Sequence, residues 1–551
     1  MRPSHCLTLA LMWACTPEHP GGRRVGGGSE GPTGDTSADE GAAPPELVVT
    51  QPAGVRDLTA ATSGETSVRW TRRHDGYEVE GSVVGAYDVH PGDVWNVVAT
   101  GPSGVTEVEH TVAPPPGGNV LLVVVDDIGI DHIGAYGVGV DPPETPRMDA
   151  LAAEGVRFRQ AYASPNCSPT RGELMSGRHA RRTGLGWIVD TGHRAGELPI
   201  DAVTLPEALQ SARSEPWSNG ALGKWHMAGP EAKDHLSHPN RSGFETFAGT
   251  WGNPIYREGY GYVRWQKLIN GVEFETEGYL TSDVVDDALL KIERLPEPWL
   301  LYVAFHAAHT PLEAPPPELV YTPLTDEPDE NELFDATVEA LDIELGRLLD
   351  GIPAGVRADT TIILVGDNGT PGHAVDPPLD PDRAKSTTFE QGVRVPLIVA
   401  GPHVVPGAVQ ESLVHVVDVY TLVAEIAGVP LTGPDTALSL AEDGTVLDGQ
   451  AMLPLLTHPD RVGRTWAYSE GFAGNGPPPY STDMRAMHEG RWSLVRHKGS
   501  EYLFDLGEEP TLTEGDDLLS AGELTAEQTN AWVRLTELLD EREAELVYEG
   551  R

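Results

Sequence analysis

Three continuous apolar runs stand out along the chain, over residues 120–125, 300–305 and 360–365. Apolar residues without polar alternation are typical of strands that are buried on both faces, as in the centre of an α/β sheet. Each run ends directly before polar residues that could bind a ligand or take part in catalysis. These are Asp126 and Asp127 after the first run, His306 and His309 after the second, and Asp367 and Asn368 after the third.

Between and after these runs, apolar residues recur with helical spacing. Intervals of four, three, four and three residues place one set on a single helical face: Phe334, Val338, Leu341, Leu345 and Leu348. Residues 416–427 and 524–546 are further predicted helices, and the second opens with the capping pair Thr525 and Gln528. Strands alternating with helices predict an α/β fold with a large, mainly parallel sheet flanked by helices.

Residues 46–114 have a different pattern, of short β-branched or aromatic runs separated by turn signals. We predict a small β-rich, sandwich-like module here. Its function is open between carbohydrate binding and spacing, and we favour spacing. The runs are Leu47 to Thr50, Ser67 to Thr71, Tyr77 to Glu80 and Val94 to Val98.

The N-terminus is typical of an export signal. Arg2 precedes an apolar stretch at 7–14 that is too short to span a bilayer. Ala14-Cys15 resembles a lipoprotein cleavage site, so we predict a signal peptide over 1–15 and a membrane lipid anchor at Cys15, with plain secretion as the alternative. Residues 16–45 are rich in Gly, Pro, Ser and Glu and are predicted to be a flexible linker. We therefore expect export to a bacterial periplasm or cell envelope.

The net charge of the chain argues against some classes of function. The chain has 551 residues, with 38 Lys and Arg against 84 Asp and Glu, a net charge of −46. A field this acidic argues against nucleic-acid binding and against long-range capture of a polyanion, although a basic pocket can still bind one anionic group. Of three cysteines, Cys6 and Cys15 lie in the predicted signal, which leaves Cys167 alone in the folded body and excludes an internal disulfide.

Asp126, Asp127, Asp367 and Asn368 all follow predicted central strands. Ligands of open α/β sheets gather beyond the carboxyl ends of the strands, where these four side chains would converge. Hard oxygen donors suit Ca²⁺ or Mg²⁺. Each pair taken alone is better explained as a turn, just as Cys167 alone is better explained as a small buried hydrophobe.

The residues around Cys167 resemble the signature of sulfatases, Cys-x-Pro-x-Arg over 167–171 and Leu-x-Ser-Gly-Arg over 174–178. Further elements occur in the order of that family across residues 119 to about 505. One departs from the pattern, because the usual Glu-Gly-Gly is Glu390-Gln391-Gly392. The elements are Asp126 to Gly129, Thr145 to Ala152, Gly223 to His226, Ala308 to Leu312, Asp367 to Gly369 and Lys385 to Pro396.

This resemblance implies an alkaline phosphatase-like α/β catalytic domain over 117–460. It also implies a C-terminal subdomain over 461–551, with a small antiparallel sheet and a helix. In the family, the cysteine is oxidised to formylglycine (3-oxoalanine) by a maturation enzyme, and its hydrate is a geminal diol. One hydroxyl attacks sulfur, and the other lets the carbonyl re-form and expel sulfate.

The resemblance also implies the site. One divalent cation, Ca²⁺ with Mg²⁺ as the alternative, would be held by Asp126, Asp127, Asp367, Asn368 and the modified Cys167. The catalytic set would be Cys167, Arg171, Lys224, His226, His309 and Lys385. In it, Arg171 holds the diol and the metal cluster, Lys224 and Lys385 bind sulfuryl oxygens, His226 is the base for elimination, and His309 serves the leaving group. His306 does not match the motif and is left out.

We therefore expect a sulfuric ester hydrolase acting on a sulfate ester of an aryl alcohol or a carbohydrate. The alternatives are a phosphomonoester or phosphonate-ester hydrolase of the same superfamily and an exported binding protein without catalysis. Aromatic residues between 228 and 280 are predicted either to stack on the substrate or to form the core of an insertion. They are Trp251, Tyr256, Tyr260, Tyr262 and Trp265.

Overall fold

The computed structural model describes residues 47–549 apart from short gaps, so the predicted signal peptide and linker lie outside the described residues. None of the helices that it describes combines the length and apolarity needed to cross a bilayer. The gaps are 51–57, 63–66, 73–77, 81–82, 85–93, 102–103, 112–117, 190–195, 213–215, 255–258, 403, 434–437, 441–443, 458–460 and 508–510.

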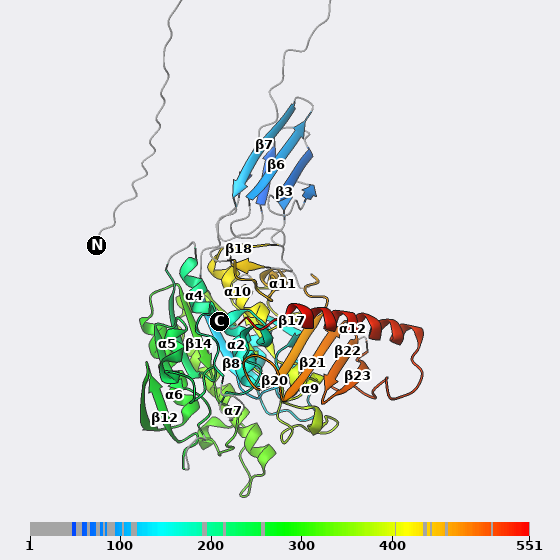
Figure 1. Ribbon diagram of the computed structural model, residues 1–551. Helices are drawn as coiled ribbons and strands as arrows, with labels where there is room; N and C mark the ends of the chain where they lie inside the picture. The colour runs from blue at the N-terminus through cyan, green and yellow to red at the C-terminus, as the bar shows by residue number, and fades with distance from the viewer. Residues whose placement is uncertain are drawn as a thin grey trace, which may run out of the picture. The chain divides into compact units, whose positions relative to one another are not determined.

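A ten-stranded sheet organises residues 119–415, in the order β13-β12-β11-β10-β14-β8-β15-β16-β9-β17 (Figure 1). The run from β11 to β15 is parallel, as predicted, whereas β16 and the hairpin β12–β13 are antiparallel to their neighbours and make the sheet mixed. The strands are β8 (Asn119–Val125), β9 (Val156–Tyr162), β10 (Ser218–Lys224), β11 (Thr246–Thr250), β12 (Arg264–Ile269), β13 (Val272–Glu277), β14 (Trp299–Ala304), β15 (Thr360–Gly366), β16 (Leu397–Ala400) and β17 (Ala408–His415).

The three predicted apolar runs form β8, β14 and β15, which are adjacent and fully buried. Alternate side chains of β8 enter two different hydrophobic cores, Leu122 and Val124 on one face of the sheet and Leu121 and Val123 on the other. A strand of this kind needs apolar residues at every position, which explains the continuous pattern in the sequence.

Helices supply the outer layer on both faces. α2 and α10 pack into the core that contains Leu122, and α1, α6 and α7 pack into the core that contains Leu121. Two of these confirm predicted helices, α7 with its apolar stripe and α10. The longer helices are α1 (Pro146–Glu154), α2 (Cys167–Ser176), α6 (Leu280–Arg294), α7 (Glu330–Gly351) and α10 (Val417–Ala427). The short ones are α3 (Ala180–Thr183), α4 (Leu205–Ala208), α5 (His238–Arg241), α8 (Ala354–Ala358), α9 (Glu390–Val393) and α11 (Leu453–Thr457).

The C-terminal part forms the predicted small antiparallel sheet, in the order β20-β21-β22-β23, with α12 (Ala526–Glu545) lying along it (Figure 1). The predicted capping pair is confirmed, because the Gln528 N–H donates to the Thr525 hydroxyl and the Thr525 N–H donates to the Gln528 side chain. The strands are β20 (Ala467–Ala473), β21 (Thr482–Glu489), β22 (Trp492–His497) and β23 (Ser500–Asp505).

The predicted N-terminal module consists of two antiparallel sheets, β1-β2-β5 and β4-β3-β6-β7. Both contribute to one small core, in which the rings of Trp70 and Trp95 meet edge to face at 6.5 Å. This is the sandwich-like arrangement predicted from the short β-branched and aromatic runs. The strands are β1 (Leu47–Thr50), β2 (Leu58–Thr62), β3 (Ser67–Arg72), β4 (Glu78–Glu80), β5 (Val83–Val84), β6 (Val94–Gly101) and β7 (Gly104–Thr111).

Candidate active site

The carboxyl ends of β8 and β15 bring the predicted acidic residues together. These strands are parallel neighbours, and Val125 pairs with Gly366, so Asp126 and Asp367 follow side by side. The Asp367 N–H donates to Val125 O. Both carboxylates are fully buried. Two residues that are 241 positions apart in the chain are thus held at one point by strand register.

The second member of each pair joins the same cluster. Asp127 has a φ of 63°, in the left-handed region, and its N–H donates to Asp367 Oδ1 at 3.2 Å. The Asn368 side-chain amide donates to Asp127 Oδ1 at 2.8 Å. The four carboxylate and amide residues predicted to bind metal therefore lie in one buried cluster, and the explanation of each pair as an exposed turn does not describe this structure.

Three cations surround these carboxylates. Arg171, from α2, donates through Nε and Nη2 to Asp367 Oδ2 at 3.0 and 2.7 Å, and its Nη1 donates to Lys224 O at 2.9 Å. Lys224, at the end of β10, donates to Asp126. Lys385, from the loop before α9, donates to Asp127. Each buried carboxylate thus has at least one cationic partner, and Asp126 also lies 3.8 Å from Arg171 Nη2.

The loop that carries Lys385 is fixed despite its departure from the Glu-Gly-Gly pattern. The Asp380 N–H donates to Gln391 Oε1 at 2.9 Å, so the extra side chain closes the loop. A Cβ atom on Gly369 would lie 1.7 Å from Gln391 O, which explains why glycine must follow Asn368.

Burial and charge shift the pKa values of the cluster in different directions. Burial and the neighbouring Asp126 raise the pKa of Asp367 to about 6, against the lowering effect of Arg171. Burial would also raise the pKa of Asp127, but Lys385 and His309 hold that pKa well below its usual value. The difference follows the partners, because Asp367 faces a second carboxylate whereas Asp127 faces cations.

Cys167 is the first residue of α2 and is fully buried beside the cluster. Its Sγ lies 3.2 Å from His226 Nδ1. Burial raises the pKa of the Cys167 thiol to about 12, although Lys224 and Lys385 act in the opposite direction. The thiol is therefore protonated at neutral pH, next to a histidine that can exchange a proton with the atoms at position 167.

His309 completes the predicted set. Its Nδ1 donates to Thr310 O at 2.8 Å, and its Nε2 lies 4.0 Å from Asp127 Oδ2. Burial, with the Lys224 and Lys385 charges, lowers the pKa of His309 to about 3, so the ring is neutral at neutral pH. Every residue predicted for catalysis thus lies in one buried centre.

His306, which the sequence analysis left out, also belongs to this neighbourhood. It is buried, its Nε2 lies 2.7 Å from Thr250 Oγ1, and burial together with the Lys224 and Arg171 charges lowers its pKa. The His-x-x-His spacing directly after a buried strand is the signal that could have identified it.

Thr370 was not predicted either. Its hydroxyl donates to Asp131 Oδ1 at 2.8 Å and accepts the Gly129 N–H at 3.1 Å. It therefore ties the loop after β8 to the loop after β15, and no feature of the sequence indicates this contact.

The aromatic residues between 228 and 280 separate into different environments. Trp265 is a core residue, and the Tyr262 hydroxyl contacts the carbonyls of His306 and His309 at 2.6 and 2.8 Å, so both are structural. Tyr260 contacts Glu275 on the β12–β13 hairpin. Trp251 is half-buried and packs against His235, and its carbonyl accepts the His226 N–H. Tyr256 lies outside the described residues.

Some oxygen atoms of the acidic cluster are free to bind a cation. Among the described residues, Asp126 Oδ1 and Asn368 Oδ1 are buried without any hydrogen-bond partner. Ligand atoms of Asp126, Cys167 and Asp367 lie within 4.8 Å of one another. Uncommitted, buried oxygen donors are what a hard divalent cation requires, so the residues present fit such an ion.

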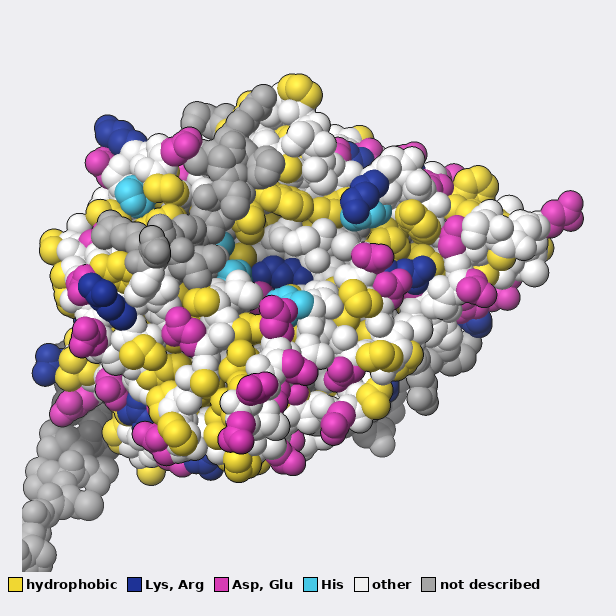
Figure 2. Space-filling view, turned by 90° about the horizontal axis from the view of Figure 1, so that it is seen from below, with side chains coloured by type: hydrophobic (Ala, Val, Ile, Leu, Met, Phe, Trp, Pro, Cys, Tyr) yellow, Lys and Arg dark blue, Asp and Glu magenta, His cyan; other side chains and the backbone are white. Residues whose placement is uncertain are grey.

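The centre reaches the surface through a few side chains. Those of His309 and Lys385 are 14% and 12% exposed. On the face shown in Figure 2, cationic and histidine side chains gather in a central hollow, and acidic side chains are spread over the surface around it. This arrangement favours a ligand with a small anionic group rather than a long polyanion.

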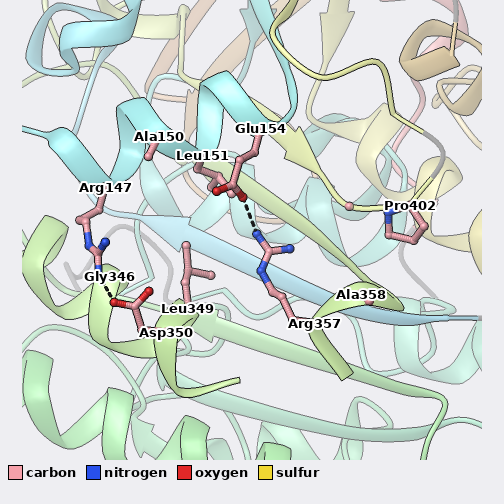
Figure 3. A pocket seen from close by; sticks show the side chains of 11 residues that line it. Arg147, Ala150, Leu151, Glu154, Gly346, Leu349, Asp350, Arg357, Ala358 and Pro402 are labelled. Carbon is pink, nitrogen blue, oxygen red and sulfur yellow. Dashed lines mark hydrogen bonds and ion pairs between the residues drawn. The ribbon is translucent and has the colours of Figure 1, made fainter. Parts of the chain in front are cut away.

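A separate surface pocket of about 570 Å³ lies between α1, α7 and α8 (Figure 3). Its charged side chains are paired with one another, Arg147 with Asp350 and Arg357 with Glu154. α1 and α8 end just before β9 and β15 begin, so this pocket lies at the opposite edge of the sheet from Asp126. It contains no residue predicted for catalysis.

Comparison with known proteins identifies similar chains. Residues 118–429 match the family model described as Sulfatase. N-acetylgalactosamine-6-sulfatase of Homo sapiens is 29% identical over 393 residues, which cover 65% of this chain and 69% of that protein. Arylsulfatase A of Homo sapiens is 28% identical over 454 residues, which cover 72% of this chain and 83% of that protein.

Solved structures show the same fold. The structure of Ps i-CgsB in complex with k-i-k-neocarrahexaose has a TM-score of 0.64 at 24% identity and covers 79% of this chain and 94% of its own. The structure of BT4656 in complex with D-glucosamine-2-N,6-O-disulfate has a TM-score of 0.59 at 17% identity. The match covers 78% of this chain and 98% of that chain. The predicted fold class is therefore confirmed.

We expect Arg171→Met to destabilise the protein strongly, because it leaves Asp367 buried without its cation. Breaking a buried ion pair costs about 3–5 kcal/mol. The matched control is Arg159→Met, which removes a partly exposed pair with Glu411 and costs about 0–1 kcal/mol. Thermal and urea unfolding of both variants measures the difference, and equal losses would contradict the assigned role of Arg171.

Proposed function

The chain belongs to the sulfatase family and is a sulfatase enzyme, and from this premise we propose that it hydrolyses sulfate monoesters through formylglycine at position 167 and one divalent cation. The observation that carries the proposal is the single buried centre in which Cys167, His226, two lysines and the acidic cluster meet. We propose an aryl alcohol or a carbohydrate as the esterified group. The sugars bound in the two similar solved structures, k-i-k-neocarrahexaose and D-glucosamine-2-N,6-O-disulfate, support the carbohydrate.

We propose Ca²⁺ as the ion, because the donors are carboxylate and amide oxygens. Asp126, Asp127, Asp367, Asn368 and the oxygen at the modified Cys167 would hold it. When bound, the ion would make a ligating hydroxyl more acidic and stabilise negative charge on oxygen.

The side chains would divide the reaction between them. The hydrate at position 167 attacks sulfur, and His226, 3.2 Å from the side-chain atom there, takes the proton that lets the carbonyl re-form and sulfate leave. Lys224 and Lys385 bind sulfuryl oxygens, and Arg171 positions Asp367. His309, the more exposed histidine, exchanges a proton with the leaving alcohol.

We further propose the setting in which this chemistry operates. The protein is exported to a bacterial periplasm or cell envelope by the signal at 1–15 and is either anchored through Cys15 or secreted. A formylglycine-generating enzyme matures Cys167. The catalytic domain spans 117–460, between the N-terminal module at 46–114 and the C-terminal subdomain at 461–551.

An aryl sulfate and an aryl phosphate with the same leaving group test the reaction class. We expect kcat/KM to be at least about 100-fold higher for the sulfate, because two lysines and one diol suit a monoanionic ester. Conversion of Cys167 is measured by mass spectrometry in the same preparation. A higher kcat/KM for the phosphate would replace the sulfatase proposal with a phosphomonoesterase, and no turnover of either ester at full conversion would leave a binding protein.

His226→Ala tests the proton role. Without the base, elimination should slow more than attack, and sulfate should accumulate covalently at residue 167 during incubation with an aryl sulfate. Intact-mass and peptide mass spectrometry detect the adduct. His373→Ala, at an exposed histidine, is the control and should show none. Normal turnover without an adduct would show that His226 is not the base.

Removal of the cation tests the metal site. Chelation should lower both activity and Tm, because an ion that binds only the folded state stabilises it by mass action, and added Ca²⁺ should restore both. Asn368→Ala should raise the Ca²⁺ concentration needed for the Tm shift by at least about 10-fold. A Tm that responds to Mg²⁺ and not to Ca²⁺ would reassign the ion, and an unchanged Tm would exclude the site.

A further inference from the structure

Asn166 lies directly before Cys167 and is only 2% exposed. It is the N-cap residue of α2, a position at which asparagine usually accepts a backbone N–H of the first helical turn with its side-chain oxygen. Here its side chain makes no capping hydrogen bond. The amide of Asn166 therefore serves another purpose than starting the helix.

The amide oxygen is instead held by the segment that carries Lys385. The Ser386 hydroxyl donates to Asn166 Oδ1 at 2.7 Å, and the Ser386 N–H donates to Pro165 O at 2.8 Å. Ser386 has a φ of 70°, so its backbone is shaped for this contact. Asn166 is thus bracketed by Cys167 in the sequence and by Lys385 and Ser386 in space, and these contacts fix the orientation of its amide.

The amide nitrogen is left over. Among the described residues, Asn166 Nδ2 is buried and has no hydrogen-bond partner. Buried donors without a partner are rare in native proteins, and in active sites they point to a ligand. The cations of this site are already committed to carboxylates, Lys224 to Asp126, Lys385 to Asp127 and Arg171 to Asp367. Asn166 Nδ2 is a donor in this centre that stays uncommitted.

We propose that Asn166 is a substrate-binding residue whose Nδ2 donates a hydrogen bond to a sulfuryl oxygen of the ester at position 167. This inference rests on the proposed sulfatase function and adds a residue to it. Because Asn166 precedes Cys167 in the chain and is hydrogen-bonded to Ser386, the residue after Lys385, we assign its donor to the sulfuryl group rather than to the alcohol. A neutral donor fits here because it binds an anion without competing for the carboxylates that hold the cation.

The test compares Asn166→Leu, which keeps much of the volume and removes both donors, with the wild type at saturating Ca²⁺. We expect kcat/KM for an aryl sulfate to fall about 10- to 100-fold, the loss of one hydrogen bond to a charged oxygen. The inhibition constant of inorganic sulfate should rise in parallel. Tm should fall only as far as it does in Ser386→Ala, because both variants lose the Ser386–Asn166 hydrogen bond and neither loses a capping bond, and conversion of Cys167 is checked by mass spectrometry.

Two further variants sharpen the result. Asn166→Asp has the same shape but a negative charge, so it should weaken the binding of inorganic sulfate more than Asn166→Leu does. If the leucine variant is unstable, the aspartate variant is used for the test in its place. Ser386→Ala keeps Asn166 Nδ2 and removes only the hydroxyl that orients the amide. Its loss of kcat/KM should therefore be smaller than that of Asn166→Leu.

The outcomes separate this inference from the proposed function. Calorimetric titration with inorganic sulfate measures anion binding without turnover. If the wild type is active and Asn166→Leu keeps kcat/KM and sulfate affinity within about twofold, Nδ2 binds only water and the inference is wrong. If the fully converted wild type hydrolyses no sulfate ester, the proposed function fails instead.

Discussion

Three buried carboxylates, those of Asp126, Asp127 and Asp367, impose the constraint on which the catalytic half of this structure depends. Charges removed from water are tolerated only with close partners of opposite sign. Each carboxylate has one, and the three cations come from three different elements: α2, the end of β10 and the loop before α9. The cluster is therefore neutralised only when these three elements assemble together at the carboxyl ends of the strands.

The same requirement explains which parts of the fold could be predicted. β8, β14 and β15 support the cluster from within two cores, so they are apolar at every position and visible in the sequence. β10 was not predicted, because its sequence is Ser-Asn-Gly-Ala-Leu-Gly-Lys. A Cβ atom on Gly223 would lie 1.9 Å from Ala304 O, so the close strand approach that delivers Lys224 demands a residue with no strand propensity. The antiparallel direction of β16 depends on pairing between distant segments and leaves no local pattern.

Within the centre, the residues that lie in a motif could be predicted, whereas Asn166 and Thr370 could not. Lys385 or Asp367 is costly to bury without a purpose, so its occurrence after a core strand or within a motif carries information. Asn166 and Thr370 have common structural explanations, as a helix cap and a loop residue. Only the coordinates show that Asn166 makes no capping bond and that Thr370 joins two loops from distant parts of the chain.

The charge of the whole chain bears on how such a centre recognises its substrate. At −46, the surface repels anions at long range, and the cations of the centre are matched by carboxylates. At about 0.1 M ionic strength this repulsion is screened beyond about 10 Å, so an anionic ester meets the attraction of the centre only on contact. Binding must then come from short-range hydrogen bonds and from the proposed divalent cation, which would release the lysines from their carboxylates. A fixed neutral donor such as the Asn166 amide suits these conditions, because it can bond to an anionic oxygen on contact and is not already paired with a carboxylate.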